Sequence, residues 1–487
     1  NENAEARKRN LSRCREKGII LPTFKQMKDP STIPSPLKSK LSHIGLWEVN
    51  PANLFRINWH NEPKEKGGLF GGVNYLEFPK ELTGVRARII ALVGKWFPTG
   101  AHKVGATYGC LAPALVTGRF DSTRQKAVWP STGNYCRGGA YNSALLACDS
   151  IAILPEEMSK ERFEWLKTVA GEVIATPGCE SNVKEIFDKC WELRKTRGDD
   201  IVIFNQFEEF GNYLWHYEVT GSAVQEVMKS LSAKAGSNPW NLAGFVSSTG
   251  SAGTIATGDR LKQLYPYSKI VAAEALQCPT LLRNGFGGHR IEGIGDKHVP
   301  WIHNVKNTDF IAAIDDQDCM DILRLFNEEE GKAYLEKIGV PASFIQSLDL
   351  IGISGMGNLL ASIKFAKYYE LTEEDVVFTV LTDSMELYLS RKEELRSQYG
   401  PFRSSDAERV YYHSLLKQGI DNVLELGYYD RMRIHNLKYF TWVEQQGKSL
   451  TELNEQWYRK DYWTSIQQLT PQIDARIEEF NREVGLL

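Results

Sequence analysis

From residue 85 onward, short apolar runs alternate with longer segments in which apolar residues recur at helical spacing. The runs predict buried strands, and the longer segments predict amphipathic helices. Predicted strands cover residues 86–92, 126–129, 150–154, 172–176, 201–204, 242–247, 269–274, 348–353 and 376–381, with helical segments such as 159–169, 182–195, 211–231 and 252–264 between them. Such alternation is typical of parallel sheets covered by helices on both faces. We therefore predict a doubly wound parallel α/β fold.

Two flanking regions depart from this pattern. Residues 1–84 are first polar and interrupted by prolines, then rich in aromatic residues and glycine, so we expect an arm and a covering segment. Beyond residue 389 the chain is charged, aromatic and of helical period, and we predict no strand there. A helical cap or dimerisation extension is favoured for this region, with a regulatory ligand domain as the alternative. The predicted regions are therefore 1–84, 85–240, 241–389 and 390–487.

Composition and charge exclude several classes of protein. A formal net charge of −3 provides no basic field, which argues against nucleic acid as a partner. No apolar run reaches the roughly 18–20 residues of a membrane span, and residues 1–17 lack the apolar segment of a secretory signal. The eight cysteines form no CxxC pair and no Cys/His cluster of zinc spacing. We therefore expect a cytoplasmic protein with reduced thiols, no metal site and no membrane partner.

Lys103 stands on a predicted turn between a strand and a helix. Pro98 and Gly100 end the preceding strand, and small or apolar residues follow Lys103 up to Leu115. Strand ends of this kind carry the ligand sites of α/β enzymes. A lysine with small and apolar neighbours could be partly desolvated, and it could then form a Schiff base with a carbonyl compound. Taken by itself, the residue is more often a solvated surface lysine, because most lysines are solvated.

A second turn, at residues 248–254, reads Ser-Thr-Gly-Ser-Ala-Gly-Thr and lies between a predicted strand and a predicted helix. Small residues let backbone N–H groups approach an anion, and a helix N-terminus adds positive potential. The segment lacks the lysine and the spacing of a nucleotide-binding loop, so it suits a monophosphate. A structural Gly-Ser turn is the alternative.

Three further turns carry polar groups after predicted strands. Residues 131–134 read Ser-Thr-Gly-Asn and could hold a carboxylate, although an N-capping turn explains Ser131 equally well. Gln206 could add a donor to the same carboxylate, whereas His216 is interpreted as a structural histidine. Ser384 follows the last predicted strand, where its hydroxyl could bond a ring nitrogen or simply belong to a turn.

In this order, the segments resemble fold type II pyridoxal-phosphate enzymes, which have the tryptophan synthase β-like architecture of two α/β domains. The cysteine synthase and cystathionine β-synthase group is the most similar. The resemblance rests on a Thr-Gly-Ala-His-Lys turn at 99–103, the Ser-Thr-Gly-Asn loop, the segment 206–221, the glycine-rich cup, the hydroxyl at 384 and Glu-Gly-Ile-Gly at 292–295. It extends from about residue 54 to residue 390.

The resemblance implies the cofactor and the site residues. Pyridoxal 5′-phosphate would be bound covalently by Lys103. Asn134 would contact its 3′-oxygen and Ser384 its pyridine nitrogen, while the phosphate would be bound by Gly250, Ser251, Ala252, Gly253 and Thr254. The substrate would be bound by Ser131, Thr132, Gly133, Tyr135 and Gln206. Tyr135 departs from the family pattern because it is bulky where a small hydroxyl residue is usual.

The implied activity is chemistry at the β-carbon of a small L-amino acid, serine-like or cysteine-like, through an aminoacrylate intermediate. β-Replacement of the cysteine synthase type, with a thiol or sulfide as co-substrate, is favoured. A β-eliminating lyase or dehydratase that releases a keto acid and ammonia is the alternative, followed by a catalytically retired scaffold. We expect a homodimer. Cys136 is interpreted as an inert buried thiol rather than as a redox switch.

Overall fold

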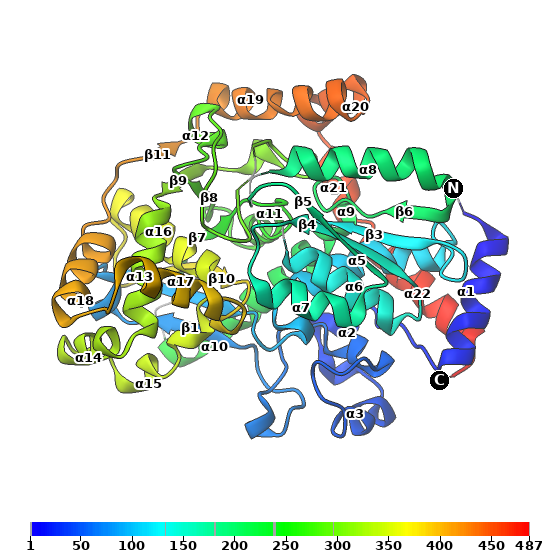
Figure 1. The fold of residues 1–487 in the computed structure, drawn as a ribbon, viewed down its shortest axis with the longest axis horizontal. Helices are drawn as coiled ribbons and strands as arrows, with labels where there is room; N and C mark the ends of the chain where they lie inside the picture. The colour runs from blue at the N-terminus through cyan, green and yellow to red at the C-terminus, as the bar shows by residue number, and fades with distance from the viewer. Residues whose placement is uncertain (1, 132, 180–181, 237–239, 296, 487) are drawn as a thin grey trace.

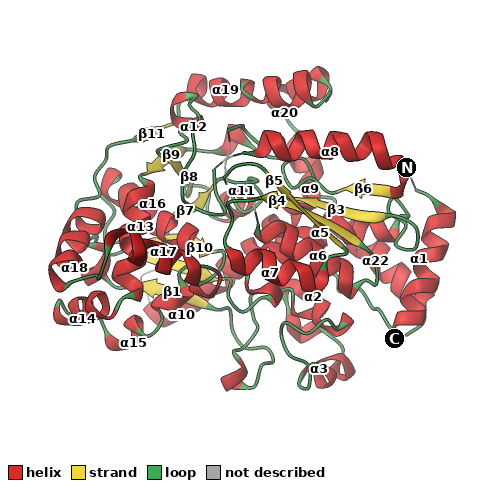
Figure 2. Cartoon of the chain, viewed as in Figure 1, coloured by secondary structure: helices red, strands yellow, loops and turns green. Residues whose placement is uncertain are grey.

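The computed structural model describes residues 2–131, 133–179, 182–236, 240–295 and 297–486. Its strands form two sheets, and helices cover both (Figures 1 and 2). The predicted α/β class and the helical C-terminal extension are confirmed. Among the described residues, no helix is long and apolar enough to cross a membrane.

The larger sheet has seven strands in the order β1-β2-β10-β7-β8-β9-β11. The central strands run parallel, while β1 and β11 pair antiparallel at the two edges. The bounds are β1 Tyr75–Phe78, β2 Arg88–Val93, β7 Asn241–Ser248, β8 Lys269–Ala275, β9 Phe310–Ile314, β10 Asp375–Leu381 and β11 Val423–Glu425. Its associated helices are α11 Ala256–Leu264, α12 Thr280–Arg283, α13 Asp316–Asn327, α14 Glu329–Lys337, α15 Ala342–Ile345 and α16 Ile353–Tyr368.

The smaller sheet has four parallel strands in the order β5-β4-β3-β6. They are β3 Lys126–Pro130, β4 Ser150–Pro155, β5 Glu172–Thr176 and β6 Ile201–Ile203. The helices of this segment are α5 Lys103–Val116, α6 Asn134–Leu145, α7 Lys160–Val169, α8 Val183–Arg197, α9 Phe210–Trp215 and α10 Gly221–Ala235. Buried side chains of β3 alternate, so that Trp129 joins the core that contains α5 and α6, and Val128 packs against α8.

Several predicted elements require correction. The expected strand at 348–353 is a short 3-10 turn followed by the start of α16, whereas β1, β9 and β11 were not predicted. The strand β11 lies in the C-terminal region, where no strand was expected, and it is only three residues long. β2 pairs with β10 in the larger sheet, although it precedes every strand of the smaller sheet. The division of the chain into domains at 85, 241 and 390 remains a prediction.

The first and last helices of the chain lie side by side at one end of the molecule (Figure 1). The N-terminal helices are α1 Ala4–Lys17, α2 Phe24–Lys28, α3 Ser35–Leu41 and α4 Lys80–Thr83. The C-terminal helices are α17 Leu389–Tyr399, α18 Ser404–Val410, α19 Tyr428–Asn436, α20 Leu450–Tyr458, α21 Tyr462–Gln467 and α22 Thr470–Val484. α22 packs against both α1 and α5, and Arg7 forms an ion pair with Glu483 at 2.7 Å. The C-terminal extension is therefore packed against the α/β body.

Candidate active site

Lys103 begins α5 directly after a tight turn, as the sequence predicted. Thr99 (φ 68°) and Gly100 (φ 69°) both adopt the left-handed region in this turn, which is unusual for the non-glycine residue. The side chain of Lys103 is buried, with only 9% of its surface exposed, so the alternative of a solvated surface lysine is wrong. Its Nζ donates to the hydroxyl of Ser251 at 3.0 Å and to Oε1 of Gln206 at 3.4 Å.

Two neutral histidines lie beside Lys103. Burial, and then the charge of Lys103, lowers the pKa of His102 to about 3. The ring of His102 packs edge-on against that of His216 at 4.8 Å. His216 also has a pKa well below its usual value because it is buried, and its Nδ1 is 2.9 Å from the hydroxyl of Thr220. Both rings therefore stay uncharged near neutral pH, which suits the structural role predicted for His216.

The loop between β7 and α11 forms a cup of backbone amides. The predicted helix at 252–264 begins only at Ala256, because residues 250–255 form this loop. Ala252 takes a positive φ of 60°. Among the described residues, the amides of Gly250, Ser251, Ala252 and Thr254 have no hydrogen-bond acceptor, so they can serve an anion. α11 directs its N-terminal amides towards the same loop.

Gly253 is required where the cup meets α9. A Cβ atom at this position would lie 1.9 Å from Oδ1 of Asn212. The amide of Asn212 donates to the hydroxyl of Ser251 at 2.9 Å and thereby fixes the residue that also accepts from Lys103. The cup and the lysine are therefore held in one hydrogen-bonded unit.

A second loop joins β3 to α6 and faces the cup. Gly133 has a φ of 148°, and its amide donates to the hydroxyl of Ser131 at 2.9 Å. The ring of Tyr135 borders the cavity, but its hydroxyl donates to the carbonyl of Phe204 at 3.1 Å, in the core. Tyr135 therefore narrows the site and offers no free hydroxyl to a ligand. Thr132 lies outside the described residues.

Two adjoining cavities meet at Lys103. One follows the cup and is bordered by Gly250, Ser251, Ala252, Gly253, Thr254, Gly293, Ile294, Asn358 and Thr382, among others. The other is bordered by Ser131, Asn134, Tyr135, Gln206, Phe207 and again Gly250, Ser251, Gly293, Ile294 and Thr382. The structure thus brings together Lys103, Gln206, the predicted cup residues and, from the other loop, Ser131, Asn134 and Tyr135, whereas Gly133 borders neither cavity. We call the two cavities the cup half and the amide half.

Ser384, whose hydroxyl was predicted to contact the cofactor ring, does not border the cavity. Ser384 is fully buried and borders neither half of the cavity, whereas Thr382 borders both. A contact from Ser384 to a bound ring therefore remains a prediction. The sequence reasoning also missed Phe207, Gly293, Ile294 and Asn358 as wall residues. The Glu-Gly-Ile-Gly motif at 292–295 was the available signal for two of them.

The residues present fit pyridoxal 5′-phosphate. The cup offers backbone amides without an acceptor among the described residues, next to the N-terminus of α11, which suits a phosphate. The buried Lys103 amine suits an aldehyde, and Asn134 has a buried Oδ1 without a hydrogen-bond partner among the described residues. Within the described part of the chain, no cluster of three or more His, Cys, Asp or Glu side chains is arranged to bind a metal ion.

Comparison with known proteins agrees with this geometry. The model of the pyridoxal-phosphate dependent enzyme family matches residues 95–334. The cysteine synthase of Staphylococcus aureus (strain N315) is 30% identical over 264 residues, which cover 54% of this chain and 75% of that protein. The probable cysteine synthase of Bacillus subtilis (strain 168) is 28% identical over 294 residues, covering 60% and 85%.

A solved structure shares the fold. The crystal structure of cysteine synthase from Entamoeba histolytica superposes with a TM-score of 0.57 at 20% identity and covers 70% of this chain and 94% of that one. The family match, the relatives and the shared fold agree with the lysine, the cup and the opposing loop. The chain belongs to the pyridoxal-phosphate-dependent enzyme family: it is an enzyme that uses pyridoxal 5′-phosphate and acts by β-replacement or β-elimination.

Proposed function

We propose that the protein catalyses β-replacement on a small serine-like or cysteine-like L-amino acid, with a thiol or sulfide as the second substrate. One observation carries the proposal. The Lys103 amine lies at the junction of the two halves, in hydrogen-bond contact with Ser251 of the cup and with Gln206 of the amide half. A single buried amine can therefore reach both a phosphate-anchored cofactor and an amino acid beside it.

The two halves have separate tasks in this proposal. Lys103 would bind the cofactor covalently, residues 250–254 would bind its phosphate, Asn134 would contact its 3′-oxygen, and Ser384 would be the partner of its ring nitrogen. When bound, the cofactor supplies an electron sink for the α-carbon of the amino acid. Ser131, Thr132, Gly133, Tyr135 and Gln206 form the substrate side, where backbone and amide donors orient the carboxylate.

Lys103 also moves the proton. Its Nζ would accept the α-proton of the substrate, and the hydroxyl of Ser251 and the Gln206 side chain hold that Nζ in place. The neutral rings of His102 and His216 pack beside the amine without offering a competing proton near neutral pH. The ring of Tyr135 borders the amide half, which is consistent with a first substrate that has a short side chain.

Replacement and elimination give different products, so one assay separates them. Purified protein with added pyridoxal 5′-phosphate is incubated with O-acetyl-L-serine, L-serine or L-cysteine, each with and without sulfide or a small thiol. Replacement yields a new thioether or thiol amino acid, detected by mass spectrometry, only when the nucleophile is present. Keto acid and ammonia released at the same rate with or without the nucleophile would establish elimination and overturn our proposal.

Two other outcomes concern the state of the protein. A protein that fails to bind the cofactor and turns over none of these amino acids would be a retired scaffold. We also propose that the chain acts as a cytoplasmic homodimer. Size-exclusion chromatography with light scattering tests the assembly, and a mass equal to that of one chain would exclude the dimer.

A further inference from the structure

A line of buried polar side chains extends behind Asn134, away from the cavity. Asp383 lies two residues after the end of β10, and its Oδ2 accepts from Nδ2 of Asn134 at 2.6 Å and from the hydroxyl of Tyr388 at 2.6 Å. At most 5% of the surface of any of these three residues is exposed. None of these contacts beyond Asn134 has a task in the proposed reaction.

Arg162 of α7 holds the far side of this group. Its Nη2 donates to the Tyr388 hydroxyl at 2.7 Å and lies 3.7 Å from Oδ2 of Asp383. Arg162 is completely buried directly behind the loop of the amide half: a Cβ atom built at Gly133 would lie 2.2 Å from Nη1 of Arg162. The same Nη1 lies 3.3 Å from Oε2 of Glu292. Gly133 therefore leaves the space that Arg162 needs.

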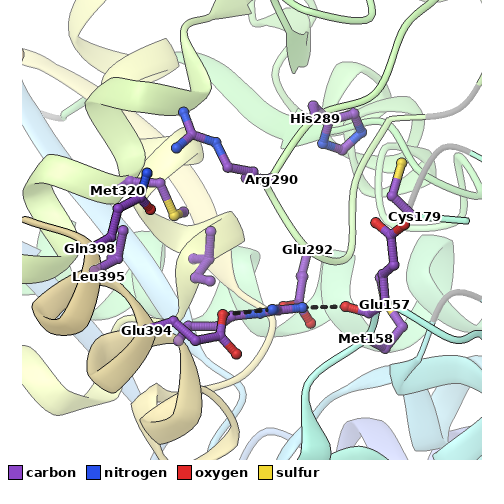
Figure 3. A pocket seen from close by; sticks show the side chains of 12 residues that line it. Glu157, Met158, Cys179, His289, Arg290, Glu292, Met320, Glu394, Leu395 and Gln398 are labelled. Carbon is purple, nitrogen blue, oxygen red and sulfur yellow. Dashed lines mark hydrogen bonds and ion pairs between the residues drawn. The ribbon is translucent and has the colours of Figure 1, made fainter.

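The line ends at Arg391 of α17, which borders a separate cavity. Its Nε donates to Oε1 of Glu292 at 2.6 Å. Its Nη1 donates to the carboxylate of Glu394 at 2.8 Å, and its Nη2 donates to the backbone carbonyl of Glu157. Figure 3 shows the three acceptor residues Glu292, Glu394 and Glu157 at the edge of this cavity. Negative and positive groups alternate from Asp383 through Arg162 and Glu292 to Arg391, so each buried charge has an opposite neighbour.

Asp383 restricts the orientation of the Asn134 amide. Oδ2 of Asp383 accepts both from Nδ2 of Asn134 and from the hydroxyl of Tyr388, so the NH2 group of Asn134 faces Asp383. Burial raises the pKa of Asp383, and the guanidinium of Arg162 reduces that rise. One N–H of Asn134 is thus committed to Asp383. Its second N–H and its Oδ1, which has no partner among the described residues, remain for a ligand.

We propose that Asp383, held by Tyr388 and Arg162, is the positioning residue that sets the amide of Asn134 towards the cofactor. The inference rests on the proposed contact between Asn134 and the 3′-oxygen. Since that oxygen is conjugated with the ring, a change in its hydrogen bond changes the absorption spectrum of the bound cofactor. A buried network with a purely structural role would alter stability and leave the spectrum unchanged.

The test compares two tyrosines that each lose one hydroxyl. Tyr388→Phe removes the hydroxyl that donates to Asp383 at 2.6 Å. Tyr411 belongs to the C-terminal extension, and Tyr411→Phe removes the hydroxyl that donates to the backbone carbonyl of Glu81 at 2.6 Å. Both side chains are buried. Asp383→Asn keeps the shape of the positioning residue but replaces an acceptor oxygen by a donor, and is the stronger variant.

We expect Asp383→Asn to move the long-wavelength absorption band of the bound cofactor and to raise the dissociation constant for pyridoxal 5′-phosphate about tenfold, or about 1.4 kcal/mol. Tyr388→Phe should move the same band by a smaller amount, and Tyr411→Phe should leave it in place. Thermal unfolding of each apo variant, followed by circular dichroism, monitors folding. A band and a dissociation constant unchanged in both Asp383→Asn and Tyr388→Phe would overturn the positioning role.

The wild-type protein separates this outcome from a failure of the proposed function. If the wild type binds the cofactor but catalyses no replacement, the proposed function fails while the spectral comparison still decides the role of Asp383. If it catalyses replacement and both variants keep the wild-type spectrum, only the positioning role fails. If Asp383→Asn does not fold, Tyr388→Phe decides, since it removes only one oxygen atom.

Discussion

The two halves of the active-site cavity are built in different ways. The cup half presents backbone amides of residues 250–254, and its side chains are small. The amide half presents the side chains of Ser131, Asn134 and Gln206, backed by buried charges around Asp383. Backbone groups fixed by a loop and a helix offer little variation, whereas side chains and their supports can be changed one at a time. The cup half therefore suits an invariant phosphate, and the amide half suits selection of a substrate.

Loss of the residue shared by both halves should have the largest effect. Lys103→Ala removes the amine that contacts Ser251 and Gln206, so we expect a fall in kcat of roughly 10²–10⁴-fold. The long-wavelength absorption of the bound cofactor should also disappear. Steady-state kinetics and visible spectroscopy measure both. Lys126→Ala is the control, because Lys126 is paired with Asp149 on the surface. A variant at 103 with wild-type absorption would exclude the assigned role.

The next effect belongs to the cup half. Gly253→Ala would place a Cβ 1.9 Å from Asn212, and overpacking of this kind costs about 1–3 kcal/mol. We expect the affinity for pyridoxal 5′-phosphate to fall about 10- to 100-fold, measured by fluorescence titration of the apo protein. The same change at Gly72, where a Cβ meets nothing within 4 Å, should have no effect on affinity. Equal affinities in the two variants would contradict a backbone-built phosphate site.

A substitution in the amide half should leave the affinity for pyridoxal 5′-phosphate unchanged. Gln206→Leu removes a carboxylate donor, and hydrogen bonds to charged groups contribute about 1.5–3 kcal/mol. We expect KM for the amino acid to rise about tenfold or more, while the affinity for pyridoxal 5′-phosphate stays near the wild-type value. Substrate titrations at saturating cofactor measure the first quantity. A large loss of cofactor affinity with little change in KM would show that the halves are not divided as we describe.

The smallest effect on the site should come from the C-terminal extension. Lys438 is buried and donates to the carbonyls of Trp301 and His303 at 2.9 and 2.7 Å and to Gln456 at 2.7 Å. Lys438→Met leaves these acceptors without that donor, so the free energy of unfolding should fall by about 1–3 kcal/mol. Urea denaturation measures this loss, and kcat/KM should change less than about twofold.

A larger kinetic effect of Lys438→Met would revise the comparison. The amide of Ile302, between the two carbonyls that Lys438 binds, donates to the carbonyl of Phe207 at 3.3 Å, and Phe207 borders the amide half. A fall in kcat/KM of more than tenfold in the folded variant would show that the extension shapes this half.

The sequence was sufficient for what depends on local pattern. Apolar runs predicted the three strands that end before Lys103, before residue 131 and before the cup. The small residues of the cup predicted the cup itself. The sequence did not show that β2 joins the larger sheet, because pairing with β10 bridges nearly three hundred positions and has no local signal. The contact of Asp383 with Asn134 also has no local signal, because 249 positions separate the two residues. Thr382 and Ser384 could not be separated either, since only tertiary packing decides which of them borders the cavity.

The site of covalent attachment tests the central claim most directly. Purified protein saturated with pyridoxal 5′-phosphate is reduced with sodium borohydride, digested and mapped by mass spectrometry. We expect a single pyridoxyl-phosphate group on the peptide that contains Lys103. When inorganic phosphate occupies the cup before the cofactor is added, we expect no such group. Attachment at a different lysine, or no attachment under saturating cofactor, would contradict the site described for this protein.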